Sequence, residues 1–388
     1  MTKKQMSSKE RIIATIKHES TDHIPLCFDG VGHQSVEFVN RLYPDPFERA
    51  KFYLDLETDT AIRTGPPLFS ETGFETRQWK ENSPNEPYPL LVKEYITPKG
   101  SLKQIVRKHD YPFESVAIFN DHHVPQSRSV KYLIENEEDL EKLEYILTPP
   151  NDEELRPFRQ WSKVAKKFCD ENQIIFAGYL QGIGDPLLWM SGIEPLIMAS
   201  VMNPDFLEHY IDIVAKWNRA ILEILIDVGV DLVIRRGWYE STDFWAPDLF
   251  RQFLFDPLKK EIEIAHQAGV YFTYVMNSSA KPMLGIFKEL GFDIYSNIDP
   301  MTAGMDLSEI KQEIGATITL YGGVNNFLVI ENGTEEEVEK AVTEAIEKLS
   351  PGGGFILGTG DALDYMFVNP EVTKRNFYKM IEVWKKLR

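Results

Sequence analysis

The stretch NPDFLEHYIDIVAKWNRAILEILIDVGVDLVIRRGW, residues 203–238, contains the unit from which the fold can be predicted. Asn203 is placed to cap a helix, Pro204 occupies its first turn, and apolar residues then recur at helical spacing as far as Gly229. The run that follows, VDLVIRR, is apolar on successive residues, which is typical of a strand covered on both faces. A helix that leads directly into such a strand indicates parallel pairing in an α/β sheet.

The same kind of apolar run occurs seven more times along the chain. The other runs are residues 23–30, 58–65, 173–182, 269–277, 292–300, 316–326 and 353–361. Two of the intervening helices have clear starts, a capping box at Thr334 and Glu337 and the pair Asn369-Pro370. Eight strand-helix units predict an α/β fold in which residues 1–388 form a single (β/α)8 TIM barrel domain. A doubly wound open sheet is the alternative.

One region departs from this alternation of strands and helices. Residues 68–125 alternate in polarity and are rich in turn residues, whereas the rest of the chain alternates apolar runs with amphipathic stretches. We therefore predict a β-rich insertion after the second strand.

Composition limits the location and the partners of the protein. The chain has 388 residues and a formal net charge of −18, from 60 acidic and 42 basic residues. This charge disfavours nucleic acid and anionic membranes as partners, because both would be repelled at long range. Cys27 and Cys169 lie far apart, the N-terminal residues lack the apolar core of a signal peptide, and no apolar run approaches the length of a membrane span. A cytoplasmic protein is predicted.

Several segments are similar to one known superfamily, in the same order along the chain. They are RIIATIKHESTDHIPLCFDG (11–30), EYITPKGSL (94–102), GDPLLWMSGIEPLIMASVMNPDFLEHYI (184–211), WAPDLFRQFLFDPLKKEIEIAHQAG (245–269) and residues 320–361. Together they resemble the uroporphyrinogen decarboxylase superfamily. The resemblance implies a (β/α)8 barrel and one of two activities. These are decarboxylation of an anionic tetrapyrrole and methyl transfer to or from a corrinoid carried by a partner protein.

The motif after the first strand separates these activities. Decarboxylases of the superfamily carry an Arg-rich motif there, because guanidinium groups bind carboxylates in bidentate fashion. The matching stretch in this chain, FDGVGHQSV (28–36), contains Asp29 and His33 but no Arg. Arg63, Arg235 and Arg236 could still supply cations from other strands.

A second motif concerns zinc. The resemblance implies that thiol-methylating members hold zinc with a His-x-Cys pair after strand five and a Cys after strand eight. Here these positions fall on Tyr274, Met276 and Asp361. A phenol and a thioether are poor zinc ligands, so a zinc-thiolate site is not expected. Whether any metal binds stays open, with His33, Glu240 and Asp361 as candidate ligands.

The remaining branch of the superfamily gives the functional prediction. We predict a methyltransferase that moves a methyl group from a small methylated donor, a methoxylated aromatic or a methylamine, to a corrinoid protein. The cobalamin would be carried by that partner. A decarboxylase of a tetrapyrrole or another carboxylate, and a non-catalytic tetrapyrrole-binding barrel, are the alternatives. A homodimer is left open.

Candidate site residues follow from the rule that barrel enzymes place their chemistry at the C-terminal strand ends. The predicted catalytic residues are Glu240, His33, Asp361 and Tyr274. The predicted substrate-binding residues are Asp29, Arg63, Arg235, Trp238, Tyr239, Met276, Asn277, Asn297 and Asn325. His33 is chosen because imidazole titrates near neutral pH, and Glu240 as a carboxyl acid, although a salt bridge or a helix cap would explain it equally. Neighbouring residues on a strand point to opposite faces, so at most one of Arg235 and Arg236 faces the interior.

Overall fold

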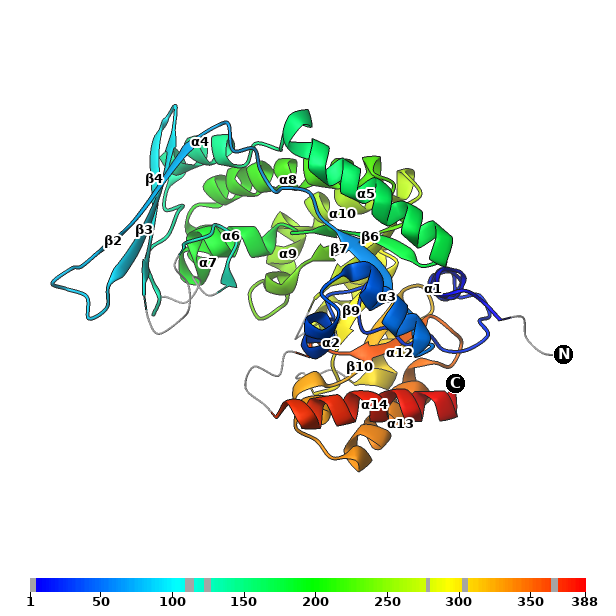
Figure 1. The fold of residues 1–388 in the computed structure, drawn as a ribbon. Coiled ribbons are helices and arrows are strands. Elements are labelled where there is room, and N and C mark those ends of the chain that lie inside the picture. The colour runs from blue at the N-terminus through cyan, green and yellow to red at the C-terminus, as the bar shows by residue number, and fades with distance from the viewer. Residues whose placement is uncertain (1–4, 109–114, 122–126, 277–279, 302–305, 364–368) are drawn as a thin grey trace.

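A parallel sheet of seven strands forms the centre of the computed structural model and curves around its inner face (Figure 1). The structure describes residues 5–108, 115–121, 127–276, 280–301, 306–363 and 369–388. In sheet order the strands are β1 (Ala61–Thr64), β6 (Ile175–Leu180), β7 (Leu232–Arg236), β8 (Tyr271–Val275), β9 (Ile294–Ile298), β10 (Thr319–Val324) and β11 (Phe355–Thr359). Each lies within one of the predicted apolar runs.

The first predicted run, residues 23–30, joins the two edges of this sheet instead of forming a regular strand. Leu26 makes an isolated parallel bridge to Leu357 in β11, and Cys27 makes one to Asp59 just ahead of β1. The backbone N–H of Cys27 donates to the Leu357 carbonyl at 3.0 Å, and the N–H of Asp59 donates to the Leu26 carbonyl at 2.7 Å. This short segment therefore connects the first and last strands of the sheet.

Helix α1 (Ser8–Ile16) covers the inner face of the sheet at the end where the strands begin. A capping box between Ser7 and Glu10 starts the helix. Ile12 and Ile16 pack into a buried apolar cluster on the inner face. The other members of that cluster are Cys27, Val31, Ala61, Ile175, Ala177, Leu232, Ile234, Val275, Ile294, Tyr321 and Ile356. Because this end is filled with apolar side chains, polar chemistry is confined to the opposite end, where the strands finish.

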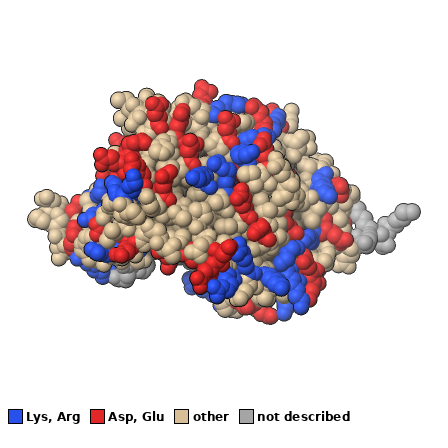
Figure 2. Space-filling model, turned by 90° about the horizontal axis from the view of Figure 1, so that it is seen from above, with Lys and Arg blue, Asp and Glu red and all other residues tan. Residues whose placement is uncertain are grey.

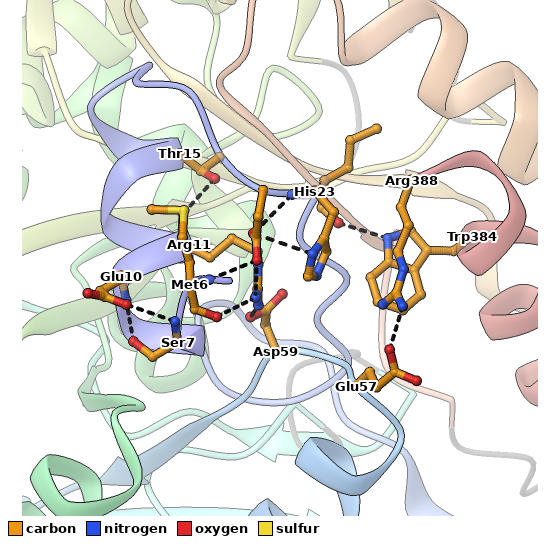
Figure 3. A network of polar contacts seen from close by, with 12 residues as sticks. Met6, Ser7, Glu10, Arg11, Thr15, His23, Glu57, Asp59, Trp384 and Arg388 are labelled. Carbon is orange, nitrogen blue, oxygen red and sulfur yellow. Dashed lines mark hydrogen bonds and ion pairs between the residues drawn. The ribbon is translucent and has the colours of Figure 1, made fainter. Parts of the chain in front are cut away.

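Arg11 fixes α1 to the loop that leads into β1 (Figure 3). Its Nε and Nη2 donate to the two carboxylate oxygens of Asp22 at 2.7 and 3.1 Å. Its Nη1 donates to Asp59 at 2.6 Å, and Nη2 also donates to the Met6 carbonyl at 2.7 Å. Burial raises the pKa of Asp59 to about 6 although Arg11 opposes the rise. Arg11 thus holds two carboxylates and a carbonyl around the start of the chain.

Helices pack against the outer face of the sheet (Figure 1). Those in contact with its strands are α3 (Pro46–Asp55), α5 (Asp152–Asn172), α8 (Pro204–Asp227), α10 (Phe255–Gln267) and α13 (Glu335–Leu349). The other helices are α2 (Glu37–Leu42), α4 (Glu137–Ile146), α6 (Gly184–Ser191), α7 (Ile193–Met202), α9 (Pro247–Phe253), α11 (Leu284–Leu290), α12 (Leu307–Ile314) and α14 (Pro370–Leu387). Three short helices are η2 (Trp238–Glu240), η3 (Lys281–Met283) and η4 (Asn326–Glu331). The predicted starts of α8, α13 and α14 are confirmed, although the Asn203 side chain makes no capping hydrogen bond at the start of α8.

A second sheet lies in the chain between β1 and α4. It is antiparallel, in the order β2 (Glu75–Glu81), β3 (Leu90–Thr97), β4 (Gly100–Arg107) and β5 (Ser129–Lys131). It projects to one side of the parallel sheet (Figure 1). Most of it falls in the stretch predicted to be β-rich.

The surface carries charges of both signs. On the face shown in Figure 2, Lys and Arg side chains are interspersed with Asp and Glu and do not gather into one continuous basic surface. In the part of the chain that the structure describes, no helix has both the length and the apolar character needed to cross a bilayer.

Candidate functional site

Alternation along the strands decides which side chains reach the inside of the sheet. In β7, Leu232 and Ile234 belong to the inner-face cluster, whereas Val233 packs among the outer-face residues. The same alternation places Arg236 inside and Arg235 outside, so the prediction that only one of them faces inward is confirmed. We use "rim" for the inner-face residues at the carboxyl ends of the strands together with the segments that follow them.

His33 lies within an aromatic group on the rim. Its Nδ1 is 3.2 Å from the Tyr179 hydroxyl at the end of β6. The His33 ring meets the Trp238 ring edge-on, with 4.6 Å between the ring centroids. The Arg236 guanidinium lies 4.7 Å from the Trp238 ring and 4.9 Å from the ring of Trp189 in α6. Aromatic surface, imidazole and phenol are therefore gathered at the ends of β6 and β7.

His33 is held in its neutral form. Burial lowers its pKa from 6.5 to about 3, and the guanidinium groups of Arg236 and Arg63 act in the same direction. Tyr179 keeps its proton because burial raises the phenol pKa, although the guanidinium of Arg236 opposes the rise. We infer that the hydroxyl donates to Nδ1, which places the remaining ring proton on Nε2. In this form His33 can donate a hydrogen bond to a substrate heteroatom without adding a charge.

The charge of Arg236 is matched by two carboxylates. Its Nε donates to Asp185 of α6, and its Nη2 lies 3.0 Å from Asp121 Oδ2. Asp121 also accepts from Trp189 Nε1 at 2.5 Å and from the Tyr239 hydroxyl at 2.9 Å. Tyr239, which the sequence suggested as a substrate-binding residue, is thus bonded to Asp121.

Asp29 and Arg63, both predicted to bind substrate, form an ion pair with each other. Arg63 Nη2 lies 2.6 Å from Asp29 Oδ1, and Arg49 of α3 donates through Nε to Asp29 Oδ2 at 3.1 Å. Asp29 is buried. The carboxylate is therefore held between two guanidinium groups, and the charge of Arg63 is satisfied within the protein.

Carboxyl and amide groups from three neighbouring strands meet elsewhere on the rim. Asn325, after β10, donates through Nδ2 to Asp299 Oδ2 at 2.7 Å. Asp299, after β9, packs against Gly360 at the end of β11, and Asp361 is the next residue. Burial, with a smaller contribution from the nearby carboxylates of Asp299 and Glu331, raises the pKa of Asp361 to about 6. Asp361 can therefore gain and lose a proton close to neutral pH.

Asn297, near the end of β9, combines an unusual backbone with an unused donor. Its φ of 70° lies in the left-handed region, which few residues other than Gly and Asn adopt. The side chain is 1% exposed, and its Oδ1 accepts from Ser296 Oγ at 2.9 Å and from Gln34 Nε2 at 3.2 Å. No described residue accepts from its Nδ2. An unused buried donor beside backbone strain is typical of a binding site.

Four predicted site residues lie behind the sheet instead of on the rim. They are Arg235, Glu240, Tyr274 and Met276, each 0% exposed. Arg235 pairs with Glu240, and its Nε donates to Glu261 of α10 at 3.0 Å. The Tyr274 hydroxyl donates to Glu240 Oε2 at 2.7 Å. These contacts form a closed network between the sheet and the outer helices.

Glu240 anchors helix α6 from within this network. Its Oε1 accepts from the backbone N–H groups of Gly184 at 2.7 Å and Ile183 at 3.3 Å, where the helix begins. A carboxylate is stabilised at a helix N-terminus. A Cβ on Gly184 would lie 2.5 Å from Glu240 Cγ, so the close approach requires glycine. Helix α6 also supplies Asp185 to Arg236. By holding this helix, Glu240 helps to position Asp185 at the rim, although Glu240 itself does not lie there.

The zinc site of the thiol-methylating relatives does not fit this chain. Tyr274 and Met276 face the outer helices, whereas the inner-face residues of β8 are Thr273 and Val275. Neither of these is a zinc ligand. Asn277 lies outside the described residues. Within the described ranges, no three or more His, Cys, Asp or Glu side chains are grouped to hold a metal ion.

The comparison with protein families decides the assignment. Residues 120–386 match the family described as uroporphyrinogen decarboxylase (URO-D). The chain belongs to the uroporphyrinogen decarboxylase family. A curated relative in sequence is the methylcobamide:CoM methyltransferase MtaA of Methanosarcina barkeri, which is 25% identical over 168 residues. The match spans 42% of this chain and 47% of that protein, so it covers about half the length of that relative.

Two solved structures share the fold of this family member. A methyltransferase from Methanosarcina mazei has a TM-score of 0.63 at 18% identity, over 99% of both chains. A B12-independent methionine synthase from Shewanella sp. W3-18-1, in complex with selenomethionine, has a TM-score of 0.50 at 10% identity. That comparison covers 94% of this chain and 98% of the other. At these identities the likeness establishes the fold alone.

Several rim residues of this uroporphyrinogen decarboxylase family member were not selected from the sequence. They are Asp121, Tyr179, Asp185 and Trp189, whereas Arg236 was named only as a possible source of positive charge. Strand alternation offered a signal for Tyr179 and Arg236, because each lies two residues beyond an inner-face residue of its strand. The meeting of Asp121 with Trp189 has no such signal, since it depends on how distant segments pack.

Proposed function

We propose that this protein is a methyltransferase that moves a methyl group from a small methylated donor, a methoxylated aromatic or a methylamine, to a corrinoid protein. We further infer that residues 1–388 act as one (β/α)8 barrel domain, with the segment around Cys27 as its first strand and residues 68–125 as a β-rich insertion. Cys27 and Cys169 are both buried and unpaired, which supports a cytoplasmic location.

The observation that carries this proposal is the charge state of the rim. His33 is a neutral donor, and Asp361 is a weakly acidic carboxyl. Arg63 and Arg236 are both bound to carboxylates. Removing a methyl group from an ether or an amine requires hydrogen bonding and a proton for the departing heteroatom, and does not require free cations. The rim supplies these groups.

Each group then has a defined role. His33 Nε2–H donates to the heteroatom of the donor, and Trp238 offers it an aromatic surface. Asp361 transfers its proton to the same heteroatom as the bond to the methyl carbon breaks, and regains a proton from solvent. The cobalt(I) form of the acceptor supplies the electron pair for the new carbon–cobalt bond. Gln34 Nε2 donates to the Thr359 carbonyl at 3.0 Å, and the Leu363 N–H donates to the Ser35 carbonyl at 2.8 Å, so the segments that carry His33 and Asp361 lie side by side, which supports their sharing one site.

Glu240 and Tyr274 receive a different role from the one the sequence suggested. Both are fully buried behind the sheet, so neither can touch a substrate without rearrangement. We assign them to holding α6 in place. Asn297 and Asn325 stay candidates for binding the donor.

The decarboxylase alternative requires guanidinium groups that can grip several carboxylates. Arg63, Arg235 and Arg236 are instead paired with carboxylates of the chain itself. A tetracarboxylate substrate would have to displace these partners, so the pairing favours the methyltransferase.

Methyl transfer can be measured directly. Purified protein is mixed with free cob(I)alamin and a panel of methoxylated aromatics and methylamines, and the absorbance change to methylcobalamin is followed. Asp361→Asn is expected to lower the rate about 100-fold or more, because it removes the general acid. Asp212→Asn, an exposed carboxylate on α8, is the matched control and should retain the wild-type rate.

Other outcomes would replace the proposal. If no donor methylates cobalamin but uroporphyrinogen loses carbon dioxide, the protein is a decarboxylase. If neither reaction occurs while a tetrapyrrole binds, the barrel is a binding protein. A wild-type rate in Asp361→Asn would remove this residue from the chemistry.

A further inference from the structure

Helix α7 presents a strongly apolar surface to the solvent. Ile197 and Met198 are 40% and 55% exposed, and Val201 and Met202 are 72% and 74% exposed. Leu196 and Ser200 are the buried residues of this helix. Single exposed apolar side chains are common on proteins, but a contiguous exposed group usually marks an interaction site.

This apolar surface lies beside the rim. Helix α7 follows α6 directly after Gly192, whose φ of 79° ends the first helix (Figure 1). Helix α6 carries Asp185 and Trp189, which hold Arg236. Other exposed apolar side chains also follow the carboxyl ends of strands, namely Met301 after β9 and Phe327 and Leu328 after β10. A molecule that covers the rim would therefore meet apolar side chains on several segments.

The charged residues of α7 itself and of the start of α8 are acidic. Glu194 of α7 and the residues Asp205 and Glu208 of α8 are exposed. The sequence has no Lys or Arg between Lys167 and Lys216. A second copy of this chain would bring the same carboxylates against them, in a protein of net charge −18. A partner with an apolar surface bordered by Lys and Arg is complementary to both features.

We propose that α7 is a docking surface for the corrinoid-bearing partner, and that the partner meets it with an apolar surface bordered by basic residues. This inference rests on the proposed function, because an acceptor carried on a protein must be brought to the rim. Met198 and Met202 are flexible and polarizable, and such side chains adapt to a partner surface. The acidic border would speed association and exclude acidic partners.

The double variant Val201→Gln/Met202→Gln tests this surface, because both side chains are exposed and Gln is well tolerated in helices. Val164→Gln, 57% exposed on α5, is the matched control. Methyl transfer is measured to free cob(I)alamin and to cobalamin-loaded corrinoid proteins. We expect the double variant to raise KM for the protein-borne acceptor at least 10-fold and to leave the rate with free cob(I)alamin unchanged. The control should change neither.

A second pair of variants tests the acidic border. For the wild type, KM for the corrinoid protein should rise with salt concentration, and Asp205→Asn/Glu208→Gln should weaken that dependence. An unchanged KM in the α7 double variant would overturn the proposal. Sedimentation showing a wild-type dimer that this variant dissociates would overturn it too, because a second copy would then occupy the surface.

The same measurements distinguish an error in the docking proposal from an error in the proposed function. If the wild type methylates free cob(I)alamin but no corrinoid protein, the docking proposal is wrong and the reaction stands. If it methylates neither, the proposed function is wrong and the docking proposal falls with it.

Discussion

Replacing Asp361 by Asn is expected to stabilise the protein while it removes activity. Burial raises the pKa of this carboxyl from 3.8 to about 6, so between these values the folded protein keeps a proton that the unfolded chain has lost. The free energy of unfolding therefore falls as the pH rises through this range, and above the range the whole decrease in stability is present. The shift corresponds to at most about 3 kcal/mol at pH 7.5, and to about 1.5 kcal/mol at pH 5. An Asn side chain can still accept from the N–H of Ala362 through Oδ1, as Asp361 does at 2.6 Å.

Urea unfolding followed by tryptophan fluorescence measures this effect for wild type, Asp361→Asn and the exposed control Asp212→Asn. At pH 7.5 the gain of up to about 3 kcal/mol corresponds to an unfolding temperature about 4 °C higher. At pH 5 the gain should be about half as large, and the control should stay within about 0.5 kcal/mol of wild type at both pH values. A variant less stable than wild type, or an equal gain at both pH values, would refute the reasoning.

Three further substitutions probe other parts of the structure. Arg235→Met leaves two buried carboxylates without a cation and should cost about 3–5 kcal/mol in urea unfolding; wild-type stability would contradict the network. Tyr179→Phe removes the hydroxyl bonded to His33, so ¹⁵N NMR should show loss of the pure Nε2–H tautomer, with methyl transfer slowed up to about tenfold. An unchanged tautomer would refute that assignment. Arg11→Ala should lower the free energy of unfolding by about 3 kcal/mol or more, read as a lower urea midpoint. An unchanged midpoint would show that the ion pairs of Arg11 contribute little to stability.

The elements that sequence reasoning located correctly are those with local causes. The apolar runs of β6 to β11 are short and covered on both faces, so their composition alone distinguishes them from the amphipathic helices. The helix starts at Pro204, in the first turn of α8, and at the capping box of Thr334 depend on residues within one turn. The run at residues 23–30 gave only isolated bridges, because its pairing depends on Asp59 and Leu357, which are distant in the sequence.

Side-chain placement at the site depended on facts that are not local. A shift of one residue along a strand moves a side chain to the other face, and this separates Tyr274 and Met276 from Val275. The same rule separates Arg235 from Arg236. Glu240 follows β7 closely in sequence, but its carboxylate turns back to the start of α6 behind the sheet. Its position depends on the glycine at 184, which no pattern around residue 240 reveals.

The link between residues near 26 and the last strand also sets the order in which the protein can be completed during synthesis. Leu26 leaves the ribosome more than three hundred residues before Leu357, its partner in β11. The Trp384 indole that donates to the Ile24 carbonyl at 2.8 Å arrives later still. Until then the growing sheet keeps an unpaired edge, which is where nascent chains aggregate. A chain that terminates before Phe355 lacks the strand that Leu26 pairs with, so its sheet cannot be completed.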